Sequence, residues 1–430
     1  MCFERLRLRA VGPFEDLDLE FPPGTRDDLA DVYLLVGANG SGKSTILRAL
    51  ASFFRAEGPA RARVWWTGGE IRGRFAGHDA EVVGAPQPDR YTPVVQRGGG
   101  QLFPVSANGR YNFWAYAYSG SRDIDTLRAT PSHAPEGDPT SNAANFDHRA
   151  ASEDIARWIV QLDYADAVAA RSGTRDAISA RAPLAVAERL LSETLGAPVR
   201  VAVDLRADTH GRYGVLVHVG DDAPIDVSLL PDGVKSILAW TLDLVMRLHR
   251  TPWVDDLPLA ERAFLLLLDE IDVHLHPQWQ RRVLPIIQRT FPRAQVVAST
   301  HSPFVVGSAW DARTYPLTID PVTRRARLMT REELSLADSD DDPRLGLGAF
   351  AGTSYRVILT QIFGISTEFD AQTESELSSF GKLKHDVLRG AQPLDSLQRA
   401  AKGLLDRSPE VASIVWSELK AAEARIGSKS

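Results

Sequence analysis

The clearest pattern in the chain is a short apolar run that passes into a glycine-rich turn and then into a helical pattern. Residues 31–36 read Asp-Val-Tyr-Leu-Leu-Val, which is typical of a parallel strand buried on both faces. Residues 37–45 read Gly-Ala-Asn-Gly-Ser-Gly-Lys-Ser-Thr, and apolar side chains recur at helical spacing over residues 46–54. This order of strand, turn and helix is the context that the phosphate-binding motif G-x-x-x-x-G-K-S requires.

The chemistry of the turn predicts a nucleotide site. Glycines let the backbone turn where a Cβ would clash, so that backbone N–H groups and the positive end of the next helix face phosphate oxygens. We expect Lys43 to reach the β- and γ-phosphates and the Ser44 hydroxyl to ligate Mg²⁺. The expected nucleotide-binding residues of the turn are Gly37, Asn39, Gly40, Ser41, Gly42, Lys43, Ser44 and Thr45.

Alternating apolar and polar positions predict antiparallel hairpins on either side of this motif. One spans residues 3–21 with a Gly-Pro turn, and a second spans residues 199–219. Residues 111–118 read as a further strand, and residues 55–110 as short strands and glycine-rich loops. The pattern therefore predicts an α/β fold whose mixed sheet carries an antiparallel β subdomain.

A second apolar run, residues 264–268, ends in the two acids Asp269 and Glu270. Buried strands seldom end in paired carboxylates unless these have a task. Asp269 suits a Mg²⁺ ligand, and Glu270 suits the positioning and polarising of an attacking water. The alternative is a loop cap with a solvated neighbour.

A third apolar run, residues 294–300, ends at His301. A lone histidine is usually structural, but the carboxyl end of a strand beside the acidic one belongs to the ligand face of an α/β sheet. There His301 can hydrogen-bond a γ-phosphate. We therefore expect Lys43, Glu270 and His301 to be the catalytic residues, and Ser44 and Asp269 the metal ligands.

Helical patterns occupy most of the remaining chain. Residues 125–150 are rich in loop-forming residues, and helices are expected at 151–171 and 175–195. An acidic loop at 338–342 precedes four further helical patterns between residues 353 and 426. The predicted parts are an N-terminal part of the head at 1–124, a loop and helical insertion forming a lid or arm at 125–195, a C-terminal part of the head at 196–330, and a helical C-terminal extension at 331–430.

Composition narrows the functional class. The chain has 430 residues, 44 % of them hydrophobic, which is enough for a sizeable core. Its net charge of −7 gives no general attraction to nucleic acid, so DNA contact would need a local basic face. One cysteine, no secretory signal and no membrane-spanning run lead us to expect a cytoplasmic protein without a membrane partner.

Together the motifs at 37–45, 269–277 and 299–303 resemble those of ATP-binding-cassette ATPases of the RecF and SMC branch. Within that branch they look like the stand-alone bacterial AAA-annotated ATPases of DNA repair and phage defence. These include the ATPase subunits of Septu and retron systems and the ATPase half of OLD nucleases. The resemblance implies a P-loop NTPase head of ABC type with a short helical insertion and a helical tail. It also implies ATP with Mg²⁺ as ligands, and a head-to-head homodimer or larger oligomer with two ATP molecules between the protomers.

The resemblance further identifies residues 230–233, Leu-Pro-Asp-Gly, as the signature loop. Asp232 and Gly233 would then contribute to the ATP bound by the other protomer. Pro231 stands where the family usually has serine, so one hydroxyl donor is lost and activation across the dimer is expected to weaken; Ser228 is an alternative donor.

Two further family features are less regular in this chain. Gln96 and Gln101 precede residues 111–118, and no glutamine closely follows them, so the metal-sensing glutamine of the family is unassigned. His274 and His276 follow the acidic strand and are either interface contacts or ordinary loop residues.

The resemblance implies an ATPase that regulates a partner effector, a nuclease or toxin bound through the helical tail, in anti-phage defence. A RecF-like repair or recombination ATPase that acts as an ATP-dependent clamp on DNA is the alternative. A transporter cassette is disfavoured by the altered signature and by the lack of a coupling segment for a membrane domain. A scaffold that binds ATP without hydrolysis is disfavoured by the presence of Glu270. The sequence contains no recognisable nuclease centre.

Overall fold

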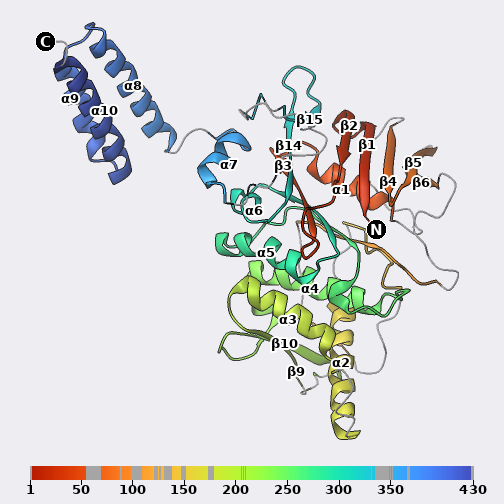
Figure 1. Cartoon of the computed structure of the whole chain (residues 1–430). Coiled ribbons are helices and arrows are strands. Elements are labelled where there is room, and N and C mark those ends of the chain that lie inside the picture. Colours follow the sequence, from red (N-terminus) through yellow and green to blue (C-terminus); the bar gives the residue numbers. More distant parts are fainter. Residues whose placement is uncertain are drawn as a thin grey trace. The chain divides into compact units, whose positions relative to one another are not determined.

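The computed structural model describes residues 2–54, 69–87, 90–97, 109–120, 124, 127–129, 138–146, 152–172, 179–204, 206, 208, 210–330, 332–334, 348, 350, 352–365 and 369–427. The chain divides into two units, Met1–Phe363 and Gly364–Ser430, and each is considered by itself (Figure 1). Gln101, part of the short strands and loops expected at 55–110, and the acidic loop at 338–342 lie outside the described residues.

An 11-stranded mixed sheet forms the framework of the first unit, in the order β6-β5-β4-β1-β2-β15-β14-β3-β13-β12-β7. Its antiparallel part contains β6 (Arg90–Arg97), β5 (His78–Gln87), β4 (Glu70–Phe75), β1 (Phe3–Val11) and β2 (Phe14–Glu20). Its parallel part contains β14 (Arg313–Ile319), β3 (Asp31–Gly37), β13 (Gln295–Thr300), β12 (Leu265–Leu268) and β7 (Ala115–Tyr118). β15 (Ala326–Leu328) joins the two parts, because it pairs antiparallel with β14 and parallel with β2. The predicted mixed sheet with an antiparallel subdomain is confirmed.

The parallel strands are buried on both faces, as their unbroken apolar sequences predict. Val32, Leu34 and Val36 of β3 face one hydrophobic cluster, whereas Tyr33 and Leu35 face another. Helix α1 (Lys43–Ser52) packs in the second cluster, and helices α4 (Asp232–Arg250) and α5 (Pro277–Thr290) pack in the first. Because both faces of these strands are apolar and buried, polar groups can be placed only at the strand ends, where the sequence motifs lie.

The antiparallel part is also tied to β13 by one buried amide. The Gln295 side chain accepts the N–H of Phe3 at 2.7 Å and donates to the Phe3 carbonyl oxygen at 2.8 Å. It thereby satisfies the backbone N–H and carbonyl groups of Phe3.

The insertion combines helices with a small second sheet. Helix α2 (Ser152–Ser172) and helix α3 (Ala182–Leu195) accompany β9 (Val199–Asp204), β10 (Tyr213–Val219), β8 (Arg128–Ala129) and β11 (Ile225–Asp226). The predicted hairpin at 199–219 is confirmed as the β9–β10 pair. Because β8 pairs with β10, this sheet joins residues on both sides of the boundary drawn at 195/196.

Two predicted elements are shorter than expected. Of the strand expected at 111–118 only β7 joins the sheet, because the backbone of Tyr111 pairs instead with Pro252 and Val254. Helix α3 begins at Ala182 and not at residue 175, with Pro183 in its first turn, where the missing N–H costs no helical hydrogen bond. Residues 173–178 are not among the described ones.

Helix α7 (Tyr355–Gln361) belongs to the first unit. Phe350, Ile358 and Ile362 are buried in its main hydrophobic cluster. The Tyr355 ring lies 4.6 Å from that of Phe304 in helix α6 (Pro303–Val306). The first part of the predicted extension therefore contributes to the core of the head.

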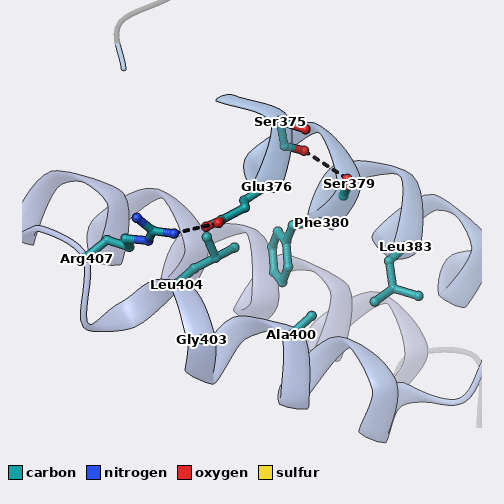
Figure 2. A pocket seen from close by; sticks show the side chains of 9 residues that line it. All are labelled: Ser375, Glu376, Ser379, Phe380, Leu383, Ala400, Gly403, Leu404 and Arg407. Carbon is teal, nitrogen blue, oxygen red and sulfur yellow. Dashed lines mark hydrogen bonds and ion pairs between the residues drawn. The ribbon is translucent and has the colours of Figure 1, made fainter. Parts of the chain in front are cut away.

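The second unit consists of helices α8 (Ala371–Leu388), α9 (Leu394–Leu405) and α10 (Pro409–Gly427) around a small core of its own. A groove of about 430 Å³ between α8 and α9 is lined by Phe380, Leu383 and Leu404 among others (Figure 2). Arg407 donates to Glu376 at 2.5 Å within it. Within the described part of the chain, no helix is long and apolar enough to cross a bilayer.

Candidate nucleotide-binding site

The register of the parallel strands brings the sequence motifs to one edge of the sheet. Leu34, Ala298, Leu268 and Tyr118 lie side by side on β3, β13, β12 and β7. One residue further along, Asp269 therefore lies beside Ser299. The phosphate loop, the acidic pair and His301 all follow the carboxyl ends of these strands, where α/β proteins bind ligands.

The phosphate loop depends on glycine at two closely packed positions. Gly37 has φ of 145°, and a Cβ there would lie 2.2 Å from the Leu317 carbonyl oxygen. Gly42 has φ of 91° and caps α1, and a Cβ there would lie 2.3 Å from the Phe14 ring. Substitution at either position therefore meets both a strained backbone and a fixed neighbour.

The polar groups of the loop fit a triphosphate. The Lys43 ammonium is buried and donates to the carbonyl oxygens of Gly37 and Ala38 at 2.8 and 2.9 Å. The Ser41 hydroxyl is fully buried and has no hydrogen-bond partner among the described residues, so an added acceptor would satisfy it. The other expected loop residues are exposed (Asn39, Gly40) or half-buried at the start of α1 (Ser44, Thr45).

Ser299 links the two expected active carboxylates. Its hydroxyl donates to Asp269 Oδ1 at 2.5 Å and accepts the backbone N–H of Glu270 at 2.7 Å. Glu270 has φ of 47°, an uncommon value for a residue with a side chain. The Ser299 contact therefore helps to hold the backbone conformation that turns Glu270 away from the strand direction.

The segment after Glu270 is tied to the strand that ends at His301. Asp272 Oδ1 accepts the Thr300 hydroxyl at 2.6 Å and the His301 N–H at 3.2 Å. Gln280 donates to the carbonyl oxygens of Asp272 and Leu275. His301 and the residues after Glu270 are thus held as one hydrogen-bonded unit.

The charged groups at this edge act on one another. Burial lowers the pKa of Lys43, while the negative charges of Asp269, Glu270 and Asp272 act in the opposite direction. Burial, and then the charge of Lys43, lowers the pKa of His301, with the three acids opposing. These mutual effects place all five groups in one electrostatic cluster. Because the pKa of His301 is lowered, its imidazole is favoured in the neutral form at pH 7, with one N–H to donate.

The expected signature residues lie at the start of α4, where Asp232 is exposed and Gly233 is buried. A Cβ on Gly233 would lie 2.4 Å from the His274 carbonyl oxygen, and the nearest atoms come from His274 and Trp279, not from the phosphate loop. Pro231 is the helix N-cap and offers no side-chain hydrogen bond. The structure therefore places Gly233 against the segment that follows Glu270 in the same chain.

The other candidate donors of this region have local roles. The Ser228 hydroxyl donates to Asp226 at 2.7 Å, so its proton is already engaged within its own loop. His276 caps α5, because its Nδ1 accepts the N–H of Gln278 at 3.3 Å. His274 is exposed and has φ of 63°.

Sequence reasoning missed three contributors to the site. Ser299 and Asp272 stood within the quoted motifs, but their roles depend on which strand lies beside which. Gly120, which follows β7, lies so close to Glu270 that a Cβ would be 2.5 Å from its Oε2 atom. No local pattern marks that glycine, since its partner lies 150 residues away in the sequence.

The fold and the phosphate loop together are those of a P-loop protein of the AAA type. Residues 32–307, more than half of the chain, match the family described as "AAA domain, putative AbiEii toxin, Type IV TA system". The chain belongs to that family. Residues 1–56 also match a family described as "AAA domain".

Shorter stretches are similar to ATPases named for retron and Septu systems. The "Retron Ec83 probable ATPase" of Escherichia coli is 38 % identical over 85 residues, which is 20 % of this chain and 16 % of that protein. Septu protein PtuA of Bacillus thuringiensis is 46 % identical over 56 residues, 13 % of this chain and 14 % of that protein. The "Retron Vc95 probable ATPase" of Vibrio cholerae is 36 % identical over 89 residues, which is 20 % of this chain and 17 % of that protein. Each match spans less than a fifth of the relative's length.

Solved structures that align with this chain include head domains of SMC proteins. The SMC head domain of Thermotoga maritima aligns with a TM-score of 0.39 and 15 % identity, covering 76 % of this chain and 98 % of that one. An SMC head bound to the C-terminal winged-helix domain of ScpA aligns with a TM-score of 0.43 and 16 % identity, covering 76 % and 97 %.

Replacement of Ser299 tests its link to the two carboxylates. In Ser299→Ala, Asp269 loses a donor and the Glu270 N–H loses its acceptor, so we expect the rate of ATP hydrolysis to fall about ten- to a hundredfold, as for other groups that orient ligands. ATP affinity should change little, because the phosphate loop is untouched. Phosphate release and equilibrium ATP binding measure the two effects.

The matched control is Ser308→Ala, which removes a half-buried hydroxyl that bonds only to the Val305 carbonyl among the described contacts. It should hydrolyse ATP as the wild type does. Equal rates for the two variants would show that Ser299 does not position the carboxylates.

Proposed function

We propose that this protein binds ATP with Mg²⁺, hydrolyses it at a head-to-head dimer interface, and uses the cycle to control a partner effector in anti-phage defence. The observation that carries the proposal is the register of β3, β13 and β12, which brings Lys43 of the phosphate loop, Asp269, Glu270 and His301 to one edge of the sheet. Membership of an AAA family and the similarity to retron and Septu ATPases support it.

Each residue of the cluster has a role in this proposal. Lys43 and the loop amides bind the β- and γ-phosphates, and Ser44 with Asp269 would hold Mg²⁺, which supplies further positive charge at the phosphates. Glu270 orients and polarises the attacking water. Neutral His301 donates a hydrogen bond to a γ-phosphate oxygen, and Asp272 fixes the backbone from which His301 extends.

A second copy of the chain would complete the site. At the start of α4, Val234 and Lys235 already donate to the Pro231 carbonyl oxygen, so the backbone N–H groups of Asp232 and Gly233 are the ones that a phosphate could accept. Asp232 and Leu229 beside it are exposed, the latter by 74 %. Both side chains are therefore available for contact with a second protomer.

The effector, a nuclease or toxin, would bind the helical tail. The tail has its own core, and its groove between α8 and α9 exposes apolar side chains (Figure 2). The tail is a compact unit of its own, as expected for a part of the chain that binds a separate protein.

Replacement of Glu270 tests hydrolysis. In Glu270→Gln the side chain keeps its size but loses the charge that polarises water, so we expect hydrolysis to fall at least about a hundredfold. ATP should stay bound and hold two protomers together. Phosphate release and light scattering after size-exclusion chromatography measure both effects.

The control is Glu261→Gln, an exposed acid outside the site, which should behave as the wild type. Equal hydrolysis by wild type and Glu270→Gln would exclude Glu270 as the catalytic residue.

Removal of the tail tests the partner assignment. The cut belongs after Phe363, because a cut near residue 345 would also remove Phe350, Ile358 and Ile362 from the main core. We expect the chain without residues 364–430 to bind ATP with unchanged affinity but to lose its effector. Copurification from the native operon, followed by mass spectrometry, identifies that effector with the full chain. A truncated chain that still retains it would contradict the assignment to the tail.

A further inference from the structure

Helix α4 contains a buried ion pair that the proposed reaction does not use. Arg247 Nε donates to Asp243 Oδ2 at 2.7 Å, and the two side chains are 8 % and 3 % exposed. A pair this buried adds little to stability, because the cost of removing both charges from water offsets their attraction. Its presence in the helix whose first turn contains Gly233 therefore points to a function in specifying position.

Tyr118 connects this pair to the sheet. Its hydroxyl donates to the same Asp243 oxygen, Oδ2, at 2.9 Å. Burial and then the charge of Asp243 raise the pKa of Tyr118, so the hydroxyl keeps the proton that it donates. Asp243 Oδ1 is buried without a hydrogen-bond partner among the described residues. The Asp243 carboxylate is thus held through Oδ2 alone, by Arg247 of its own helix and by Tyr118 of β7.

The backbone of Tyr118 leads directly to the active carboxylates. Its carbonyl oxygen accepts the N–H of Asp269 at 2.8 Å. Two residues further along, Gly120 lies against the Glu270 side chain. A shift of Tyr118 therefore moves both the backbone of Asp269 and the wall beside Glu270.

Arg247 makes a second connection between α4 and β7. Its Nη1 donates to the carbonyl oxygens of Pro139 and Ser141 at 2.8 and 3.0 Å. The segment 138–146 then bonds β7, through the Ala117 N–H and the Ala143 carbonyl oxygen at 2.7 Å. The same segment ends in Phe146, whose ring lies under the Arg48 guanidinium of α1 at 5.6 Å.

Helix α4 is consequently linked to the site at two places, through Gly233 in its first turn and through Asp243 in its middle. We propose that Tyr118, Asp243 and Arg247 form a positioning unit that transmits the placement of α4 to Asp269 and Glu270. The unit sets the rate of the chemical step and leaves ATP affinity to the phosphate loop. This inference rests on the proposed ATPase function.

The test compares two tyrosines of β7. Tyr118→Phe removes the hydroxyl that holds Asp243. Tyr116→Phe is the matched control, since Tyr116 is also buried on the same strand and its hydroxyl bonds the neutral Thr251 at the end of α4 at 3.1 Å. We expect kcat for ATP hydrolysis to fall about ten- to a hundredfold in Tyr118→Phe, as for a small misplacement of reacting groups, with KM and ATP affinity within about twofold of the wild type. Tyr116→Phe should keep the wild-type kcat.

A second measurement is independent of hydrolysis. Hydrogen exchange of the α4 amides, with and without ATP, should respond to nucleotide in the wild type and in Tyr116→Phe but not in Tyr118→Phe. A purely structural role of the Tyr118 hydroxyl would lower the stability of Tyr118→Phe but leave its response to nucleotide in place.

The outcomes separate the two claims. A wild type that binds ATP without hydrolysing it overturns the proposed function, and the exchange measurement then decides the inference alone. If Tyr118→Phe matches Tyr116→Phe in kcat and in exchange response, the positioning unit does not exist.

Discussion

The structure depends on the register of four parallel strands, β3, β13, β12 and β7. Both faces of these strands are buried under helices, so polar groups are admitted only where the strands end. The register places those ends level with one another, and this turns motifs separated by more than two hundred residues into a single site. A one-residue slip would exchange the two faces of a strand and bury the wrong side chains, so the core itself enforces the alignment of the site.

Oppositely charged side chains lie together at the strand ends, although burial alone would disfavour their charged forms. Desolvation lowers the pKa of Lys43 and of His301, and three carboxylates oppose that effect. Hydrogen bonds from Ser299 and Thr300 fix two of the acids in place. Such an arrangement is preorganised: its dipoles and charges already point to one location before a ligand arrives, so little reorganisation is needed when the phosphates bind.

The sequence was informative where chemistry is local and uninformative where it depends on tertiary contacts. The phosphate loop, the acidic pair and the histidine each follow a strand within a few residues, so the mixed sheet and its ligand edge could be predicted. The bond between Tyr118 and Asp243 joins positions 125 residues apart and follows no spacing rule. The strand expected at 111–118 was too long, because its first residues pair with Pro252 and Val254, a contact that propensity does not encode. The sequence pattern assigned helix α7 to the C-terminal extension, although Ile358 and Ile362 are buried in the core of the head.

The most direct test of the account is a crystal structure of this protein with Mg²⁺ and a non-hydrolysable ATP analogue. We predict that Lys43 Nζ and the His301 ring each lie within about 3 Å of a γ-phosphate oxygen. Ser44 and Asp269 would then lie next to the metal, and Glu270 would face the side of the γ-phosphate open to water. A nucleotide bound elsewhere, or phosphates beyond hydrogen-bonding reach of these groups, would contradict it.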